Sequence, residues 1–432
     1  MYKLHTVCRA CGFPGPSGPG GTKAAASTDK LIPVLDLGVQ PLANDFRKPG
    51  EEHAGYAPLQ VLFCPRCTLA QLSVVVRPDI LYSNYSFVTS PSKTMLSHFQ
   101  LLLGDILTEQ KPGSVVEIGS NDGLFLAFLN DHGYANMVGI DPAQNLATEA
   151  NKLGIITIND FFGLAAAKAA REAAGTVDLV VARHCFCHMD DWRGFVNALD
   201  PLVSKDTLIC IEVPYALDQI RCGSCDQLYH EHLSYLTLKS VKYLLQDSNY
   251  HLHRICHYQI HGGCVLLMIR RNDCLTPPHP SVAVAIEAEN ITEETWKHFA
   301  DESEIQIVQL KNKVMDLVHC GKKVCGYGAS AKSTVWINAC KFTRREIAFI
   351  CDSTAQKVYC NSPGSEIPIV HEGEHFTQCM DYALLFAWNY QREIVEREKR
   401  FTEGGGHWIV PVPQIRVIGR EGFAVAIDEA KE

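Results

Sequence analysis

Short apolar runs alternate with amphipathic stretches between residues 114 and 271. The runs SVVEIG, MVGID, VDLVVAR and DTLICIEVP have the length and composition of buried strands. Between them, GLFLAFLNDHG and AQNLATEANKLG have helical spacing, and the second ends on a glycine. This alternation predicts a doubly wound α/β unit. We expect the unit to finish in an antiparallel hairpin that turns near Gly262 and Gly263.

The pattern changes on both sides of this unit. Residues 1–80 are rich in loops and contain the insert GFPGPSGPGGTKAAAST, which we expect to be disordered. Residues 291–320 predict a long helix, and a second strand–helix unit begins with KKVCGYGASAKSTVWINA. We therefore expect a small N-terminal domain over 1–80, a central α/β domain with a helical entry segment over 81–275, and a second Rossmann-like domain over 276–432.

Composition narrows the possible classes of protein. The chain has 432 residues, of which 47% are hydrophobic and 20% charged, as in ordinary globular proteins. A net charge of −9 without a basic block argues against a nucleic-acid partner. The first residues show no apolar stretch of a secretory signal, and no apolar run reaches about 18 residues, so we expect neither a leader nor a membrane span. Eighteen cysteines in so long a chain indicate reduced thiols and a cytoplasmic protein, and the oligomeric state stays open.

Two C-x-x-C pairs in the first 80 residues predict a metal site. Cys8 with Cys11 and Cys64 with Cys67 can each direct two thiolates at one ion, which completes a four-cysteine shell. A closed shell of this kind binds a structural Zn²⁺ that takes no part in chemistry. A redox dithiol would need one pair on a thioredoxin-like turn, and the context here does not fit that alternative.

A glycine-containing turn joins the first strand of the central domain to its helix. Glycines at such a turn allow a ligand to approach the backbone at a helix N-terminus. About twenty residues later, Asp141 follows the next strand, where an acid can bind ribose hydroxyls. The E-x-G-x-x-x-G form is that of S-adenosylmethionine sites, although a tight turn without a ligand is the alternative. The residues expected at this turn are Glu117, Gly119, Asn121, Asp122 and Gly123.

Taken together, motifs along nearly the whole chain resemble those of the sugar C-methyltransferases that act on nucleotide-linked 4-ketodeoxysugars. The relevant segments are LDLGVQPLANDF, CPRCTLAQL, EIGSNDG, GIDPAQN, LYHEHLSYLTLKS, HGG, GYGASAKSTVWIN, CDS, PGSEIPI and WNYQREI. The resemblance implies a zinc-binding domain, a central class I methyltransferase domain that binds S-adenosylmethionine, and a C-terminal Rossmann-like domain. It adds Asn145 of GIDPAQN to the cofactor residues and implies a nucleotide-linked ketosugar, with dTDP as its nucleotide, as substrate.

Two segments depart from this family pattern. The chain has ARHCFCHMDDW over 182–192 where paired asparagines are usual, and Cys264 follows HGG where serine is usual. Both segments are expected near the active site. A methyltransferase of the same fold that acts on a different small molecule therefore remains an alternative.

The segment DQLYHEHLSYLT is expected to carry the catalytic residues. Methylation of carbon beside a ketone needs a base for the carbon-bound proton and a donor for the enolate oxygen. The resemblance aligns Tyr229, Glu231 and His232 with active-site residues and adds Tyr85, in preference to Tyr82. We assign His232 as the base, Glu231 as the group that orients it, and Tyr229 and Tyr85 as hydrogen-bond donors to the ketone.

Two other interpretations of this segment stay open. His230 and His232 could form an H-x-H metal pair if both lie on a strand, with His184 or His188 as a third ligand. Alternatively, the histidines could have a structural role in a polar core.

The C-terminal domain has a second glycine turn, Gly326-x-Gly328-x-x-Ala331, with Asp352 further on. By itself this pattern indicates a dinucleotide site and thus an oxidoreductase. The resembling family uses the domain differently, and a helix N-terminus suits the pyrophosphate of a nucleotide-sugar. An architectural duplicate is the next alternative, and a non-catalytic, zinc-stabilised binding protein is another. The residues expected to bind the substrate are Gly328, Ser330, Lys332 and Ser333.

Overall fold

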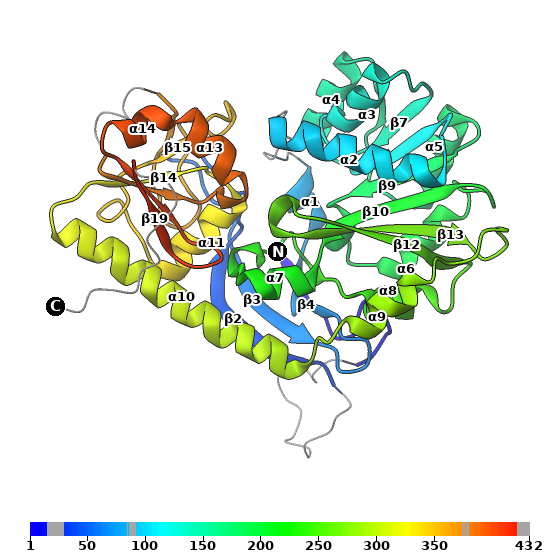
Figure 1. Cartoon of the computed structure of the whole chain (residues 1–432), viewed down its shortest axis with the longest axis horizontal. Coiled ribbons are helices and arrows are strands. Elements are labelled where there is room, and N and C mark those ends of the chain that lie inside the picture. Colours follow the sequence, from blue (N-terminus) through cyan, green and yellow to red (C-terminus); the bar gives the residue numbers. More distant parts are fainter. Residues whose placement is uncertain (15–29, 84, 86–91, 374–375, 377–379, 421–432) are drawn as a thin grey trace.

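A computed structural model of the chain describes residues 1–432 except 15–29, 84, 86–91, 374–375, 377–379 and 421–432. Figure 1 shows two α/β units side by side, with a smaller antiparallel sheet between them and a long helix along one edge. The expected glycine-rich insert lies almost wholly outside the described residues. None of the described helices combines the length and the apolar character that crossing a membrane requires.

The central unit is built on a seven-stranded sheet, which confirms the predicted doubly wound arrangement. All strands from β10 to β8 are parallel, and β13 is antiparallel to both of its neighbours. The predicted terminal hairpin is β12 with β13, which confirms the turn near Gly262. In spatial order the strands are β12 (Tyr250–Tyr258), β13 (Cys264–Arg271), β10 (Leu208–Pro214), β9 (Leu179–Arg183), β6 (Val115–Ile118), β7 (Met137–Ile140) and β8 (Ile156–Ile158).

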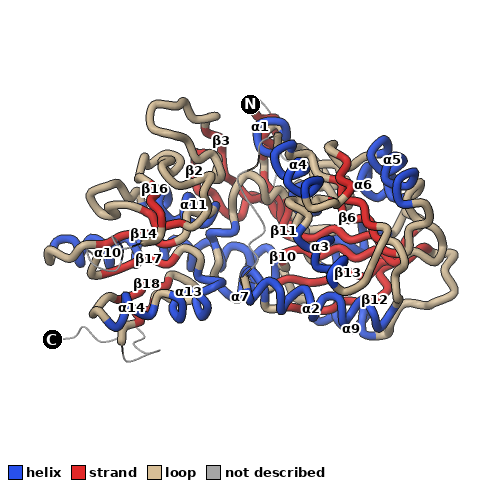
Figure 2. The backbone as a smooth tube through the Cα atoms, turned by 90° about the horizontal axis from the view of Figure 1, so that it is seen from above, coloured by secondary structure: helices blue, strands red, loops and turns tan. Residues whose placement is uncertain are grey.

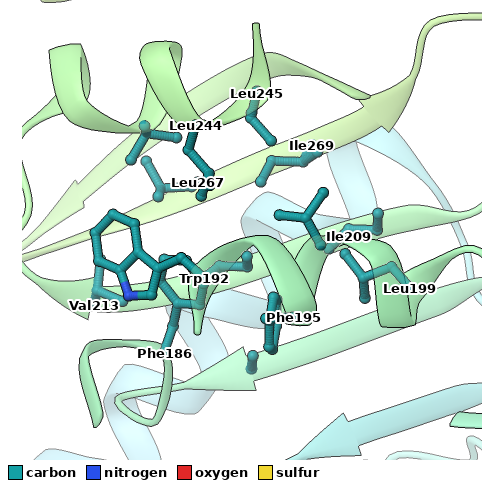
Figure 3. Close-up of a cluster of buried hydrophobic side chains, with 14 of the residues drawn as sticks. Phe186, Trp192, Phe195, Leu199, Ile209, Val213, Leu244, Leu245, Leu267 and Ile269 are labelled. Carbon is teal, nitrogen blue, oxygen red and sulfur yellow. The ribbon is translucent and has the colours of Figure 1, made fainter. Parts of the chain in front are cut away.

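Helices cover both faces of this sheet, so its strands are apolar at nearly every position. In β9, Val180 and Ala182 pack toward α6 (Trp192–Leu199) and α8 (Leu238–Leu245), and Figure 3 shows part of that core. Leu179 and Val181 alternate to the opposite core, formed with α2 (Lys93–Glu109) and α3 (Leu124–Asp131). The remaining helices here are α1 (Pro78–Tyr82), α4 (Gln144–Lys152), α5 (Leu164–Ala174), α7 (Ala216–Cys222) and α9 (Ser281–Ala288).

The N-terminal sheet is antiparallel and takes one strand from far along the chain. Its order is β11 (Ser234–Tyr235), β4 (Ala70–Leu72), β3 (Tyr56–Phe63) and β2 (Ile32–Pro41). A separate pair joins β1 (Tyr2–Leu4) to β5 (Val74–Val76). Because β11 directly follows the DQLYHEH segment, its pairing with β4 draws that segment against the N-terminal sheet. The expected domain boundaries at residues 80 and 275 stay predictions.

The C-terminal unit begins with α10 (Glu293–His319), which starts at a Thr292–Thr295 capping box and packs along β2. Figures 1 and 2 show β2 and β3 lying beside this unit. A six-stranded sheet follows, parallel except for its last strand, and α11 (Ala331–Cys340), α13 (Gln391–Arg397) and α14 (Lys399–Glu403) complete the unit. The strand order is β16 (Ile369–His371), β15 (Ile350–Asp352), β14 (Val324–Tyr327), β17 (Tyr382–Leu385), β18 (His407–Val410) and β19 (Arg416–Ile418).

Candidate active site

The four cysteines of the two C-x-x-C pairs converge as predicted. The Sγ atoms of Cys8 and Cys67 lie 3.4 Å apart, and those of Cys11 and Cys64 lie 3.6 Å apart. All four sulfur atoms lie within 4.8 Å of one another, and three of the four residues are buried. This donor set fits a tetrahedral Zn²⁺, whose charge would neutralise the thiolates.

One cavity of about 590 Å³ brings together residues from all parts of the chain. The cofactor turn and the catalytic segment face it, and so do side chains of the N-terminal sheet region and of the C-terminal unit. The predicted residues that line it are Tyr85, Gly119, Asn121, Asp141, Tyr229, His232, Ser330 and Lys332.

The turn after β6 is shaped to admit a ligand. Asn121 and Gly119 both have positive φ, and a Cβ on Gly119 would lie 2.7 Å from the Cβ of Cys185. The Asp141 carboxylate accepts the backbone N–H of Asn121 at 2.8 Å and that of Ala143 at 2.9 Å. A carboxylate has about four acceptor sites, so Asp141 keeps capacity for hydroxyl groups in the cavity. These residues fit S-adenosylmethionine, whose ribose Asp141 would bind.

Four other predicted cofactor residues are not among those that line the cavity. Three of them, Glu117, Asp122 and Gly123, belong to the turn after β6. The buried Glu117 carboxylate is paired with Arg183 at 2.8 Å, and burial raises the pKa of Glu117 to about 7 against the effect of that arginine. Asp122 accepts the N–H of Leu124 at 3.3 Å, and Gly123, at φ 78°, begins α3. These three residues hold the turn in place.

Asn145 supports a catalytic candidate. Its Nδ2 donates to the carbonyl of Tyr85 at 2.9 Å, and its Oδ1 accepts the N–H of Tyr85 at 3.2 Å. Both hydrogen-bonding groups of the side chain therefore fix the backbone of Tyr85, whose ring lines the cavity. Asn145, which we expected to contact the cofactor, therefore fixes the backbone of Tyr85, which we expected to bind the ketone of the substrate.

His232 is held in a form that can accept a proton. Its Nδ1 lies 2.9 Å from the carbonyl oxygen of Gln227, which can only accept, so we assign the ring proton to Nδ1. Its Nε2 lies 2.5 Å from the hydroxyl of Tyr229 and carries the lone pair. Burial lowers the pKa of His232 well below 6.5, and the nearby His188 and Lys332 lower it further. The imidazole is therefore neutral at physiological pH.

Glu231 does not make the contact that we expected with His232. Its Oε1 accepts the amide N–H of Asn44 at 3.0 Å, and no hydrogen bond joins the described side chains of Glu231 and His232. Burial raises the pKa of this carboxyl to about 7. The reason is a tight turn, in which the N–H of His232 donates to the carbonyl of Tyr229 at 2.9 Å and successive side chains point in different directions. The carbonyl of Gln227 orients the base instead.

His230 also points away from the cavity. Its Nε2 lies 3.2 Å from the carbonyl of Ala57 in the N-terminal sheet. The alternative of an H-x-H metal pair is therefore wrong for His230 and His232, which face opposite sides. The structural role that we left open applies to His230.

A row of contacting aromatic rings extends from His232 through the site. The His188 ring stacks on His232 with a centroid distance of 5.3 Å, and Tyr82 stacks on His188 at 5.8 Å. Tyr85 meets Tyr82 edge-on at 5.6 Å. Burial raises the pKa of both tyrosines well above 10, so their hydroxyl groups stay protonated and can donate hydrogen bonds.

The C-terminal turn contributes two of its four expected residues to the cavity. Ser333 is fully buried and forms a capping box with Ser330 at the start of α11. Gly328, at φ 90°, is required because a Cβ there would lie 2.9 Å from that of Ala387. Lys332 faces the cavity, and burial lowers its pKa while Asp226 partly restores it.

Asp226 ties this turn to the catalytic segment. Its Oδ2 accepts the indole N–H groups of Trp336 at 3.0 Å and Trp388 at 2.6 Å. Our sequence reasoning missed four residues that line the cavity. Three of them lie within motifs quoted above, which did not show which side chains face inward, and Phe161 lies in no quoted motif. The four residues are Asn44, Phe161, Gln227 and His261.

Comparisons with known proteins agree with the three-part organisation. Residues 25–82 match a zinc-binding domain family, 94–255 a methyltransferase domain family and 259–413 the C-methyltransferase C-terminal domain family. The chain is 34% identical over 424 residues to the C-methyltransferase NovU of Streptomyces niveus, covering 96% of this chain and 97% of that protein.

Solved methyltransferase structures also match part of the chain. The plantazolicin methyltransferase BpumL, in complex with SAH, covers 41% of this chain and 81% of its own at 19% identity and a TM-score of 0.31. The N-methyltransferase NodS from Bradyrhizobium japonicum WM9 covers 42% and 99%, at 12% identity and a TM-score of 0.32.

The match to NovU along nearly the whole chain and the matches to domain families also determine the class of enzyme. S-adenosylmethionine is the methyl donor, and Zn²⁺ is bound by the N-terminal cysteines. The alternatives of an oxidoreductase and of a non-catalytic binding protein do not agree with these matches. The chain belongs to the family of S-adenosylmethionine-dependent C-methyltransferases.

Proposed function

We propose that the protein methylates a carbon next to the ketone of a nucleotide-linked 4-ketodeoxysugar, with dTDP as the nucleotide. The observation that carries this proposal is the single cavity in which Asp141, the Tyr229–His232 pair and Lys332 all meet. The cavity thus combines an acid for a ribose, a base with tyrosine hydroxyl groups, and a cation at a helix N-terminus.

The residues of the cavity can support proton removal, stabilisation of the enolate and transfer of the methyl group, in that order. Nε2 of His232 takes the proton from the carbon next to the ketone, and the C–H electron pair moves to the carbonyl oxygen as an enolate forms. As the substrate enters, the Tyr229 hydroxyl turns its single proton from Nε2 of His232 to that oxygen, and the Tyr85 hydroxyl donates a second hydrogen bond to it. S-adenosylmethionine supplies an electrophilic methyl group. Held beside Asp141, the cofactor would give this methyl to the enolate carbon and keep the electron pair of the broken carbon–sulfur bond, so that the ketone would be restored.

The nucleotide end of the substrate belongs at α11. Lys332 and the N-terminus of this ten-residue helix, capped by Ser330, provide positive charge for a diphosphate. Gly328 and Ser333 shape that turn from behind. We also infer that the expected ranges 1–80, 81–275 and 276–432 are the domains, and that the free thiols of the described cysteines suit a cytoplasmic protein.

A different small-molecule acceptor is the second candidate, and a departure from the family pattern favours it. His184 lines the cavity with φ 53°, and its Nε2 lies 3.5 Å from the buried carboxylate of Glu212. An imidazole with a carboxylate partner offers different hydrogen bonds from the asparagine that is usual there. An acceptor with another hydroxyl pattern would suit it.

Two measurements test the proposal in sequence. Calorimetric titration with S-adenosylmethionine should give micromolar binding, whereas NADH should give no heat. With S-adenosylhomocysteine bound, a dTDP-linked 4-keto-6-deoxyhexose in D₂O should then exchange the hydrogen next to its ketone, and His232→Gln should abolish this exchange. Exchange that persists in the variant contradicts the role of His232, and binding without any exchange in the wild type favours the second candidate.

A further inference from the structure

A second group of metal-ligating side chains lies beside the reacting centre. Cys187, His188 and His232 each offer one donor atom, and the three atoms lie within 4.8 Å of one another. Cys187 and His188 belong to a short helical turn over Phe186–His188 that follows β9, whereas His232 comes from the segment held by β11. The group is separate from the four N-terminal cysteines.

One histidine of this group has a ligand atom without a hydrogen bond, and the other has a ligand atom whose hydrogen bond an ion would replace. The Gln227 carbonyl holds Nδ1 of His232 and so directs its Nε2 lone pair toward Tyr229. Metal-bound histidines commonly donate their second N–H to a backbone carbonyl in this way. The His188 ring stacks on that of His232 at 5.3 Å, and its buried Nε2 has no hydrogen-bond partner.

The thiol of Cys187 adds a soft ligand. This side chain is 1% exposed, and its thiol lies 3.7 Å from the carbonyl of His184 in a weak contact. One cysteine with two histidines is a donor set for Zn²⁺ or Co²⁺, and three protein ligands leave a fourth position open. His188 and His232 line the cavity, so that position faces the substrate space.

A neighbouring group is the alternative site for an ion. His184, Glu212 and Cys264 also lie within 4.8 Å of one another. One carboxylate oxygen of Glu212 already contacts His98 at 2.5 Å and the thiol of Cys264 at 3.4 Å. An ion that binds this oxygen would displace both contacts, whereas the other oxygen, Oε2, and Nε2 of His184 have no hydrogen-bond partner among the described residues. The hydrogen bonds therefore leave this group as an alternative site, and variants distinguish the two.

We propose that Cys187, His188 and His232 form a binding site for a zinc-like divalent cation, and that the occupied site inhibits the enzyme. A metal on Nε2 of His232 uses the lone pair that takes the carbon-bound proton and displaces the Tyr229 hydroxyl. The inhibition rests on the proposed role of His232, whereas the metal site itself does not.

Cobalt titration tests the site independently of any substrate. Protein that carries one Zn²⁺ per chain in its N-terminal site is titrated with Co²⁺ and followed by thiolate-to-cobalt absorption in the near ultraviolet. One further equivalent should bind and give this band. Cys187→Ala should abolish the band and weaken binding by more than about 100-fold, because changes beyond the direct ligands already cost 10–100-fold. Cys187→Ser serves as a second variant if the alanine variant does not fold.

Matched variants decide between the two groups. Cys185→Ala and Cys264→Ala should keep the cobalt band, since neither thiol belongs to the proposed set. A band that is lost in Cys264→Ala but kept in Cys187→Ala overturns the site, and so does a wild-type protein that binds no second equivalent.

The inhibition is then measured as methyl transfer to the same dTDP-linked ketosugar. Zn²⁺ at saturation of the second site should reduce the wild-type rate at least tenfold, and a chelator that leaves one Zn²⁺ per chain should restore it. The rate of Cys187→Ala, compared with and without added Zn²⁺, should change less than twofold. A wild-type rate that stays unchanged or rises while the cobalt band forms overturns the inhibitory role and leaves the metal site standing.

Discussion

The hydroxyl of Tyr229 lies 2.5 Å from Nε2 of His232, on the opposite edge of the ring from the Gln227 carbonyl. The two contacts divide the roles of the ring nitrogens. Nδ1 is fixed as a donor and Nε2 as an acceptor, and both His232 and Tyr229 line the cavity. The same arrangement places a phenol at the point where an enolate oxygen would form.

Single replacements of His232 and Tyr229 should distinguish loss of the general base from loss of the hydrogen-bond donor. We expect His232→Gln to lower kcat by 10²–10⁴-fold, the range for loss of a general base. Tyr229→Phe should lower it by about 10²-fold, as for loss of one donor to an oxyanion. Single-turnover methyl transfer, with S-adenosylmethionine affinity as a check, measures both. His371→Gln, at an exposed position, is the control and should leave kcat unchanged.

Asn145→Ala should act through Tyr85. The variant loses both hydrogen bonds to the backbone of Tyr85, each worth about 1 kcal/mol, so we expect kcat to fall about tenfold. The affinity for S-adenosylmethionine should change less than kcat. Asn151→Ala removes a side chain of the same helix whose hydrogen bonds go to Ala147 and Thr157 instead. An equal loss of kcat in both variants would mean that α4 stability, not Tyr85, is responsible.

Lys332→Met should affect the acceptor and spare the cofactor. Hydrogen bonds to charged groups contribute about 1.5–3 kcal/mol, so KM for the nucleotide-sugar should rise roughly 10–100-fold. The dissociation constant of S-adenosylmethionine should stay within a factor of two. Lys399→Met, at an exposed position of the same unit, provides the comparison. A KM that does not change would place the diphosphate elsewhere.

Loss of one cysteine of the two C-x-x-C pairs should remove the Zn²⁺ that these cysteines bind. We expect Cys64→Ser to release the structural Zn²⁺ and lower Tm, since a site with three thiolates no longer closes around the metal. Zinc content by mass spectrometry and thermal unfolding measure the two effects. Cys222→Ser, outside the described cysteine cluster, should keep its zinc. Equal zinc contents in the two variants would argue against the four-cysteine site.

Glu212 should make stability depend on pH. Burial alone would raise the pKa of this carboxyl, but His184, His98 and Arg183 hold it at about 2, below its usual 4.5. The ionised carboxylate therefore stabilises the fold fully above pH 4.5, and this contribution is lost as pH falls toward 2.

The variant Glu212→Gln removes that contribution. It should be several kcal/mol less stable than the wild type at pH 7, because it removes a buried charge that is attracted to Arg183 and hydrogen-bonded to His98. Below pH 4.5 the difference should shrink by about 1.4 kcal/mol per pH unit. Urea unfolding at pH 7, 5, 4 and 3 measures it, with Glu149→Gln on the surface as control. A difference that is independent of pH would contradict the depressed pKa.

The sequence by itself determined the features that are encoded within one contiguous segment. The alternation of apolar runs predicted both α/β units, and the C-x-x-C spacings predicted the converging cysteines Cys8, Cys11, Cys64 and Cys67. The turn with Gly119 and the later Asp141 also followed from local spacing. These features depend on backbone periodicity and short loops, which neighbouring residues control directly.

Only the tertiary structure decided which side chains meet in the cavity. Glu231 is adjacent to His232 in the chain, yet the turn between them sends it to Asn44 of the N-terminal region. Lys332 comes from a different unit and faces the same cavity as His232 because Asp226 joins the two segments through Trp336 and Trp388. Packing between units sets these contacts, and adjacency in the chain carries no information about them.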